Sequence, residues 1–384
     1  MKMIIKGGKI FDAVNKEPYI ADILVADGKI AAIGANLEIP QDAELVNAEG
    51  LNVYPGFVEA HGHIGLDGWA VGYEQTDYNE YTNPTTPELR AIDGINPFDY
   101  SLRDAALGGV TTLCSGPGSS NVIGGTFAAF KTVGKCIDDM CVKAEVAMKC
   151  AFGENPKRCY KDKSITSRMS TAAKLRDMLF RAREYMNKID AAGDDASKMP
   201  AFNMQLNAML PVMRGEMPLK CHAHQANDIL TAVRIAKEFG VKLTLEHVTE
   251  GALIVDELVK ANVPLAIGPT DGQPSKIELQ NKSWETPGIL SKAGLQVSII
   301  TDSPVTMQSQ IRFCAAMAVL NGMDPFEAFK AITINPAKHI GIEDRVGSLE
   351  VGKDADIVLM DGCLYKLESK VVATYIDGVK VEKA

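Results

Sequence analysis

The sequence predicts an α/β protein in which a (β/α)8 TIM-like barrel is joined to a small β-sandwich. From residue 52 onward, apolar runs of five to seven residues alternate with longer amphipathic stretches, which is typical of parallel strands covered by helices on both faces. The first fifty residues and those after residue 345 consist instead of short alternating runs with turn signals such as Asp27-Gly28. Such runs are typical of antiparallel hairpins.

This pattern divides the chain into two expected domains. The sandwich is formed by residues 1–50 plus 345–384, and the barrel by residues 51–344. The candidate barrel strands cover residues 53–58, 110–115, 122–134, 146–153, 218–223, 242–248, 264–269 and 296–301. The helical patterns cover residues 171–191, 226–239, 251–261, 288–293 and 308–321. Residues 64–100 form a long polar insertion, and a loop of this length at the active face of a barrel usually shapes a substrate pocket.

Composition excludes several classes of protein. The 384 residues are 46% hydrophobic and 23% charged, and no apolar stretch approaches the roughly 18 to 20 residues needed to span a bilayer. The net charge of −9 and the lack of a basic run argue against a nucleic-acid partner. The N-terminus lacks a secretory signal, and the eight cysteines form no Cys-x-x-Cys pair. We therefore expect a cytoplasmic protein with a small-molecule substrate and no membrane partner; a homo-oligomer stays open.

The histidines carry the strongest signal in the sequence. Six histidines in this chain would give about 0.09 His-x-His pairs by chance, yet there are two, His61/His63 and His222/His224. Each pair ends a predicted strand, where side chains at i and i+2 point the same way and can bind one cation. His247 ends the sixth predicted strand and Asp302 the eighth. We therefore expect a metal site at the mouth of the barrel.

The segment Pro55-Gly-Phe-Val-Glu-Ala-His61-Gly-His63 resembles the opening signature of the amidohydrolase superfamily, with Glu59 in place of the usual Asp. The closing segment Gly347-Ser-Leu-Glu-Val-Gly-Lys-Asp-Ala-Asp356 is similar to the one that returns the chain to the β-sandwich. Residues 151–158 and 245–251 look like those of the imidazolonepropionase-related and prolidase-like branch. The resemblance spans essentially the whole chain and implies a metal-dependent hydrolase of carbon–nitrogen bonds.

The resemblance also implies a ligand set. His61 and His63 would hold the more buried metal with Asp302, and His222 and His247 would hold a second, more exposed one. The bridging residue at the end of strand four would be Glu154, which is preferred over Lys149 because it lies where the strand emerges. His224 would contact substrate or take over the ligand role of His222.

The ligand types indicate the chemistry. Imidazole and carboxylate ligands suit Zn, and also Mn or Fe, with one or two ions per chain. Such an ion lowers the pKa of a bound water from 15.7 toward ~7, and Asp302 can carry the proton to the leaving nitrogen. His339 is interpreted as structural, and residues 115–125 as a pocket wall or a turn. Arg90, Lys131 and Tyr73 are candidate substrate contacts.

The leading hypothesis is hydrolysis of an amide, peptide or cyclic amide bond in a small molecule. One alternative is deamination of a heterocycle on a single metal. The other is a scaffold that has kept the fold and lost the chemistry. Five costly polar groups at one mouth argue against the scaffold.

Overall fold

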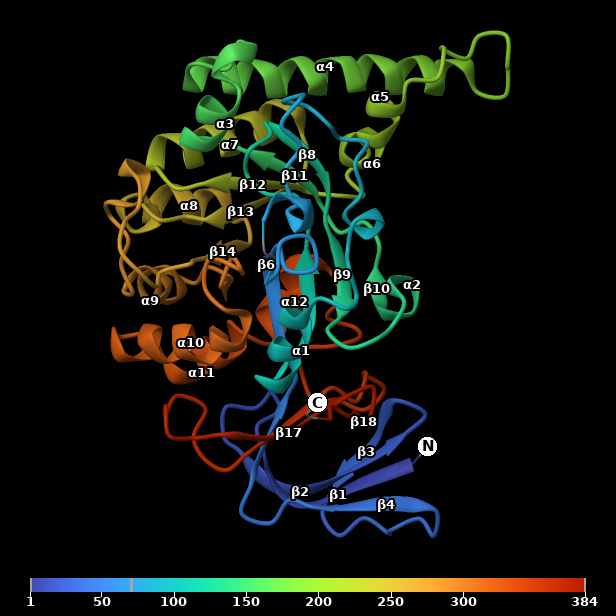
Figure 1. Cartoon of the computed structure of the whole chain (residues 1–384), viewed down its shortest axis with the longest axis vertical. Helices are drawn as coiled ribbons and strands as arrows, with labels where there is room; N and C mark the ends of the chain where they lie inside the picture. The colour runs from blue at the N-terminus through green and yellow to red at the C-terminus, as the bar shows by residue number, and fades with distance from the viewer. Residues whose placement is uncertain (1, 70–71, 383–384) are drawn as a thin grey trace.

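The structure is a computed structural model that describes residues 2–69 and 72–382, and these residues form an α/β fold with three β-sheets. One sheet of eight strands is built from both ends of the chain, and two further sheets occupy the middle (Figure 1). The α/β class predicted from the sequence is confirmed.

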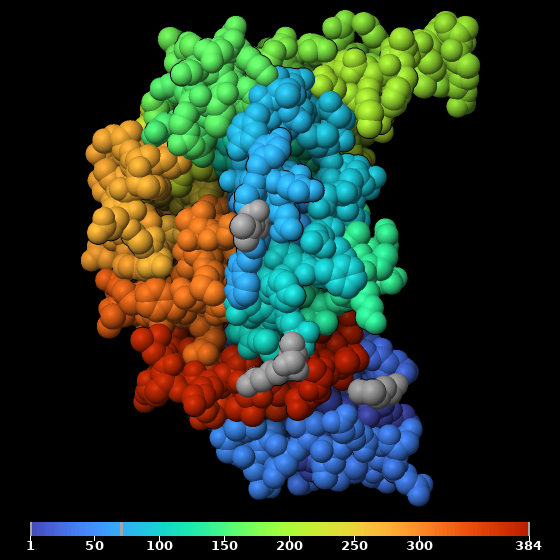
Figure 2. All heavy atoms as spheres, in the orientation of Figure 1, coloured from blue at the N-terminus to red at the C-terminus, as the bar shows by residue number. Residues whose placement is uncertain are grey.

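The terminal sheet joins residues that are far apart in the sequence. Its strands are β1 (Lys2–Ile10), β2 (Tyr19–Ala26), β3 (Lys29–Gly34), β4 (Ala43–Asn47), β5 (Asn52–Pro55), β16 (Ile357–Met360), β17 (Val371–Ile376) and β18 (Val379–Lys380). The path of this sheet runs β18-β17-β16-β5-β1-β2-β3, and β4 pairs with β1. Figure 2 shows the red C-terminal residues packed against the dark-blue N-terminal residues at one end of the molecule. This sheet has its own apolar core, in which Ile5, Ile23 and Ile357 are fully buried.

The first predicted strand, 53–58, is in fact divided between two sheets. Residues up to Pro55 belong to β5, which pairs with β16, whereas β6 (Phe57–Gly62) enters the middle of the molecule. Gly56 lies at the junction, and a Cβ atom there would come within 2.0 Å of Thr111 Oγ1. The Thr111 side chain therefore leaves no room for a Cβ atom at this position, which requires glycine.

Two adjoining sheets make up the middle of the molecule. The four-stranded sheet contains β10 (Cys141–Lys143), β9 (Ala128–Lys131), β7 (Val110–Ser115) and β6. The six-stranded sheet contains β15 (Val297–Ile299), β14 (Leu265–Ile267), β13 (Leu243–His247), β12 (Leu219–Ala223), β11 (Met148–Ala151) and β8 (Ile123–Thr126). Strands β11 to β15 run parallel, as their continuous apolar runs predicted.

Backbone hydrogen bonds connect these two sheets. On one side, the Phe127 N–H donates to Ala147 O at 3.0 Å, and the Val146 N–H donates to Phe127 O at 2.8 Å. On the other side, the His63 N–H donates to Ser303 O at 2.7 Å. The second connection brings the end of β6 next to the turn that follows β15.

The helices pack around the two middle sheets (Figure 1). They are α1 (Tyr100–Leu107), α2 (Ile137–Met140), α3 (Glu154–Cys159), α4 (Arg168–Ala192), α5 (Met204–Ala208), α6 (Leu210–Met213), α7 (Ala226–Phe239), α8 (Val255–Ala261), α9 (Thr286–Lys292), α10 (Ile311–Leu320), α11 (Pro325–Lys330) and α12 (Ile334–Ile340). Helix α7 has the bounds that the sequence predicted. Helix α4 begins after a capping box between Ser167 and Ser170, which fixes its first turn. In the described residues, no helix has the length and apolar character needed to cross a membrane.

A buried ion cluster fastens the terminal sheet to the middle of the molecule. Lys131 Nζ lies 3.0 Å from Asp354 Oδ2, 2.8 Å from Asp356 Oδ2 and 3.4 Å from Asp377 Oδ1. Burial lowers the pKa of Lys131, but these three carboxylates outweigh it and raise the pKa above the ordinary value.

The suggestion that Lys131 contacts substrate is wrong. Strand β9 runs antiparallel to β7, so its last residue points to the end of the sheet opposite the end of β7. Lys131 therefore lies at the terminal sheet and has a structural role there.

The Lys131→Met substitution should destabilise the protein by about 3–5 kcal/mol, because it leaves the buried Asp356 carboxylate without its cation. Urea denaturation followed by circular dichroism would measure this loss. Lys188→Met is the matched control, because Lys188 pairs with Glu184 on the exposed surface of α4. Equal stability of the two variants would contradict the assignment.

Candidate metal centre

Five histidines and one aspartate converge at the carboxyl ends of β6, β12, β13 and β15. The ligand atoms of His222, His224 and His247 all lie within 4.8 Å of one another, and so do those of His61, His247 and Asp302. His63 Nε2 lies 3.0 Å from Asp302 Oδ1, and His61 Nε2 lies 3.6 Å from the same oxygen. The structure therefore brings together the histidines and the aspartate that the sequence singled out.

An unusual backbone conformation orients two of these side chains toward the centre. His247 has a φ of 75° and Asp302 a φ of 50°, and this left-handed region is unfavourable for residues other than glycine. Consecutive strand residues normally face opposite sides, but the Glu246 carboxylate contacts His61 while the His247 ring lies 5.1 Å from the His61 ring. The strained turn after β13 therefore places both neighbours in one site.

The hydrogen bonds of three histidines fix which ring nitrogen faces the centre. Nδ1 of His63 lies 2.8 Å from Gly116 O, Nδ1 of His247 lies 2.7 Å from Gly268 O, and Nδ1 of His61 lies 3.1 Å from the Glu246 carboxylate. These oxygens can only accept, so each Nδ1 carries the hydrogen and each neutral ring directs the lone pair of Nε2 inward. Such orientation by a second hydrogen bond is typical of metal-ligating histidines.

Three atoms that face the centre have no hydrogen-bond partner among the described residues. His222 Nε2 and His247 Nε2 are buried without a hydrogen-bond partner among the described residues, and so is Asp302 Oδ1. Buried acceptors that face one another are costly unless a cation or a proton lies between them. The residues therefore fit a divalent metal, with imidazole nitrogen and carboxylate oxygen as donors.

The Gly/Ser-rich residues 115–125 orient the histidines. Gly116 accepts from His63, and Ser119 Oγ lies 2.8 Å from His222 Nδ1. Outside this segment, Thr249 Oγ1 lies 2.8 Å from His224 Nδ1. The sequence predicts a pocket wall or a turn at residues 115–125, and the contacts add a role: the segment holds the Nδ1 side of two predicted ligands, His63 and His222.

Lys149 is nearer to the centre than Glu154. Lys149 Nζ lies 3.1 Å from His61 Nε2, and its side chain is fully buried. Glu154 begins α3, and its backbone N–H donates to Glu278 Oε2. Among the described residues, the Glu154 carboxylate makes no hydrogen bond or ion pair with a predicted ligand. The reason is that β11 ends at Ala151, and Gly153, with a φ of 82°, turns the chain away before Glu154.

Two predicted substrate contacts lie outside this centre. Arg90 Nε forms an ion pair with Glu145 Oε1 at 3.2 Å, and its side chain is half exposed. Tyr73 is 88% exposed in a short 3-10 helix. Both residues belong to the long insertion, and among the described residues neither has a contact with the histidines.

Glu246 is a supporting residue that sequence reasoning missed. Its Oε2 accepts from His61 Nδ1 and from Lys220 Nζ, and its Oε1 accepts from Thr244 Oγ1 and His339 Nε2 at 2.8 and 2.9 Å. Burial raises the pKa of Glu246, but Lys220 and His339 outweigh it and hold this pKa well below the ordinary value. An acidic residue inside the apolar run Leu243-Thr-Leu-Glu-His was the available signal.

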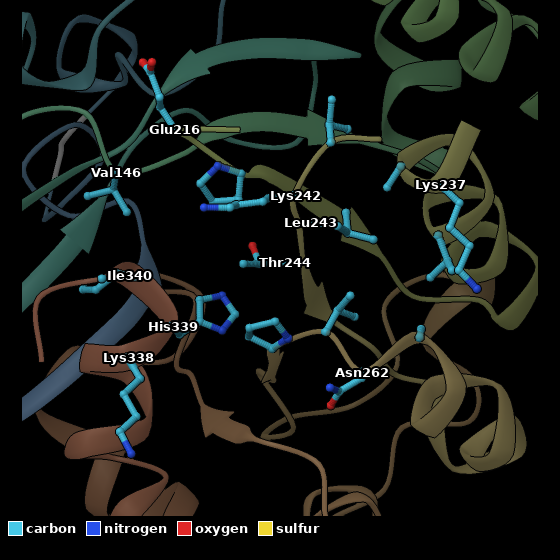
Figure 3. Close-up of a pocket in the computed structure, with 18 of the residues that line it drawn as sticks. Val146, Glu216, Lys237, Lys242, Leu243, Thr244, Asn262, Lys338, His339 and Ile340 are labelled. Carbon is cyan, nitrogen blue, oxygen red and sulfur yellow. The ribbon is translucent and has the colours of Figure 1, made fainter. Parts of the chain in front are cut away.

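A cavity of about 590 Å³ lies at the opposite end of the strands. Pro218, Leu243 and Pro264, at the amino ends of β12, β13 and β14, line it, whereas the ligand histidines lie at the carboxyl ends. Figure 3 shows His339 beside Thr244 in this cavity. Both residues bond to Glu246, so the buried Glu246 network separates the cavity from the metal centre.

Burial favours the neutral form of four histidines of the centre. It lowers the pKa of His247 to about 4, and it lowers the pKa values of His61, His222 and His224 well below 6.5. Burial also raises the pKa of Asp302, but the neighbouring imidazoles His247 and His63 outweigh it and bring this pKa below the ordinary value. Neutral imidazoles and an ionised carboxylate are the forms that bind metal.

These shifts predict that the metal-free protein loses stability as the pH falls from 7.5 to 5. The unfolded chain takes up protons near pH 6.5, whereas the folded histidines stay neutral, so each contributes a loss of up to about 1.4 kcal/mol per pH unit below 6.5. Urea denaturation in the presence of a chelator would measure the change. A denaturation midpoint that is constant or rises over this range would contradict it.

Comparisons with known proteins agree with this geometry. The Amidohydrolase family model matches residues 52–381. The crystal structure of an amidohydrolase from Thermotoga maritima MSB8 superimposes with a TM-score of 0.96 at 38% identity, covering 100% of both chains.

Two curated relatives are similar over most of this chain. Amidohydrolase tasK of Hapsidospora irregularis is 27% identical over 388 residues; the match covers 94% of this chain but only 40% of that relative. Imidazolonepropionase of Thermoplasma volcanium is 24% identical over 372 residues, covering 89% of this chain and 84% of the relative. The chain therefore belongs to the amidohydrolase family, whose members include hydrolases of carbon–nitrogen bonds, as its His-x-His signature predicted.

Proposed function

We propose that this protein is a metal-dependent amidohydrolase that hydrolyses the C–N bond of a small amide, such as an N-acyl amino acid, a dipeptide or a cyclic amide. The observation that carries the proposal is the convergence of imidazole Nε2 atoms around the Asp302 carboxylate, with His222 Nε2, His247 Nε2 and Asp302 Oδ1 lacking hydrogen-bond partners among the described residues. Membership of the amidohydrolase family supports the same chemistry.

The donor atoms form two groups that share His247, and we take this as support for two ions per chain. We assign one ion to His61, His63 and Asp302, and the second to His222 and His247. His224 lies in the second group, and we assign it there as a ligand in preference to a substrate contact. Nitrogen-rich donor sets suit zinc, and we propose zinc as the metal, with manganese or iron as substitutes.

We assign the bridging position to Lys149 instead of Glu154. Its amine lies next to His61, and burial lowers its pKa to about 8, so that part of the population is neutral near pH 7. A neutral amine can attack CO2, and loss of a proton then gives a carbamate with one negative charge. The added carboxylate would supply an oxygen to each ion.

The chain's own residues complete the reaction. A divalent ion bound here supplies a water of lowered pKa and polarises the substrate carbonyl. The Asp302 carboxylate, ionised at neutral pH, accepts a proton from the attacking water and returns it to the leaving nitrogen. Glu246 keeps His61 in the orientation that presents Nε2 to the centre.

Substrate entry requires movement at the mouth. The cavity beside His247, bounded by Thr249, Gly268 and Lys282, has a volume of only about 10 Å³. A small-molecule site usually needs about 300 Å³ or more. We propose that residues 269–285, which contribute to this boundary, open to admit substrate.

We also propose finer points of architecture and setting. The two middle sheets would act as one closed (β/α)8 barrel, and the separate core of the terminal sheet supports the division into residues 1–50 plus 345–384 and residues 51–344. The charge of −9 supports a small-molecule substrate instead of nucleic acid, in a cytoplasmic setting.

Asp302→Asn should lower kcat/KM by about 10²- to 10⁴-fold, because the amide cannot carry the proton. The measurement is turnover of N-acyl amino acids, dipeptides and cyclic amides by the metal-loaded enzyme. Asp93→Asn, at an exposed acid of the long insertion, is the control and should keep full activity. Unchanged turnover in the Asp302 variant would remove the assigned proton carrier. Release of ammonia from a heterocycle, with one metal per chain, would favour deamination.

Lys149→Met should reduce bound metal from near two equivalents to one, because the bridging group is lost while the histidines remain. Elemental analysis after dialysis would measure the ratio in wild type and variant. Glu154→Gln is the comparison and should keep two equivalents. Loss of one equivalent in Glu154→Gln but not in Lys149→Met would make Glu154 the bridging residue. Wild type that binds no metal after supplementation would favour the inactive scaffold.

A further inference from the structure

A buried carboxylate reaches the histidine cluster from the segment between β14 and α9. Glu278, in the 3-10 helix Ile277–Leu279, is 0% exposed. Its Oε1 lies 3.8 Å from His224 Nε2 and 3.9 Å from His222 Nε2. Its Oε2 accepts the backbone N–H of Glu154 at 2.9 Å, so one oxygen is held and the other faces the histidines.

These separations do not fit hydrogen bonds. A nitrogen and an oxygen that share a hydrogen lie about 2.7–3.2 Å apart. Two atoms bound tetrahedrally to one zinc ion at about 2.0–2.1 Å lie about 3.4 Å from each other. The distances around Glu278 Oε1 are therefore closer to those between two ligands of a shared ion.

The electrostatics also leave room for a cation. Lys276 Nζ lies 2.5 Å from Glu278 Oε1, which balances the carboxylate on one side. His222 Nε2 is buried without a hydrogen-bond partner among the described residues, whereas the partner of Glu278 Oε1 is the Lys276 ammonium. An anionic oxygen and an unpartnered ring nitrogen thus face the same point.

We infer that Glu278 is a further protein donor, besides the bridging Lys149, to the ion held by His222, His224 and His247, an inference that rests on the proposed function. Three imidazoles, the bridging oxygen and this carboxylate would give the ion five donors, a number that zinc can accept. Because Glu278 belongs to residues 269–285, ligation would also couple closure of this segment to the presence of metal.

The test is titration of metal-free wild type and Glu278→Gln with Co²⁺, followed by visible absorption and by competition with a chelator. The first equivalent should bind equally to both proteins. The second should bind the variant at least about 10- to 100-fold more weakly, which is the loss expected even for an outer-shell partner. Its absorption intensity should also differ, because this intensity depends on the number of ligands.

Glu250→Gln is the matched control. Glu250 is another buried carboxylate that holds the same segment, since it accepts from Asn281 Nδ2 and from the Ala226 N–H, both at 2.8 Å. This variant should bind Co²⁺ like wild type. If Glu278→Gln also binds both equivalents with the wild-type spectrum, the inference is overturned while the proposed function stands. Failure of wild type to bind Co²⁺ would instead overturn the proposed function.

If the Glu278→Gln variant fails to fold, a measurement on wild type alone still tests the inference. Adding Zn²⁺ to the metal-free protein should slow amide hydrogen exchange in residues 270–285, because one ligand of the ion comes from this segment. Exchange in α4, which lies away from the centre, should change much less. Unchanged exchange in residues 270–285 would overturn the inference.

Discussion

The site depends on the rule that a polar group buried inside the protein needs a partner there. The Glu246 carboxylate follows this rule with four hydrogen-bond donors, and one of them, His61 Nδ1, belongs to a proposed metal ligand. The orientation of the ligand is thus set by a network that extends to His339 at the other end of the strands. Those histidine nitrogens that face the mouth follow the rule only when a cation is present.

Glu59 is a second buried carboxylate with several hydrogen-bond donors, and it connects two strand ends. Its Oε1 accepts from the His61 N–H, and its Oε2 accepts from the N–H and Oγ1 of Thr301 and from Gln308 Nε2. One carboxylate therefore fixes His61 relative to the residue before Asp302. The Glu59 side chain spans this gap.

Charge is distributed differently at the two ends of the middle sheets. At the terminal sheet, Lys131, Lys29 and Arg345 balance the carboxylates of Asp354, Asp356 and Asp377. At the carboxyl ends of the strands, neutral imidazoles, a buried amine and carboxylates face one another with much less internal pairing. The first arrangement stabilises the fold, and the second is suited to binding a metal ion.

The sequence by itself determined the α/β class, most of the middle strands, helix α7 and the gathering of His61, His63, His222, His247 and Asp302 at one centre. These features follow from local periodicity and from residues at strand ends, which the chain specifies over a few neighbours. Tertiary structure alone decided that Lys149 faces His61 while Glu154 turns away, that Lys131 lies at the far end, and that Glu246 and Glu278 reach the histidines. Those outcomes depend on strand direction, on the turn at Gly153 and on contacts between residues tens to hundreds of positions apart. No short stretch of sequence encodes such contacts.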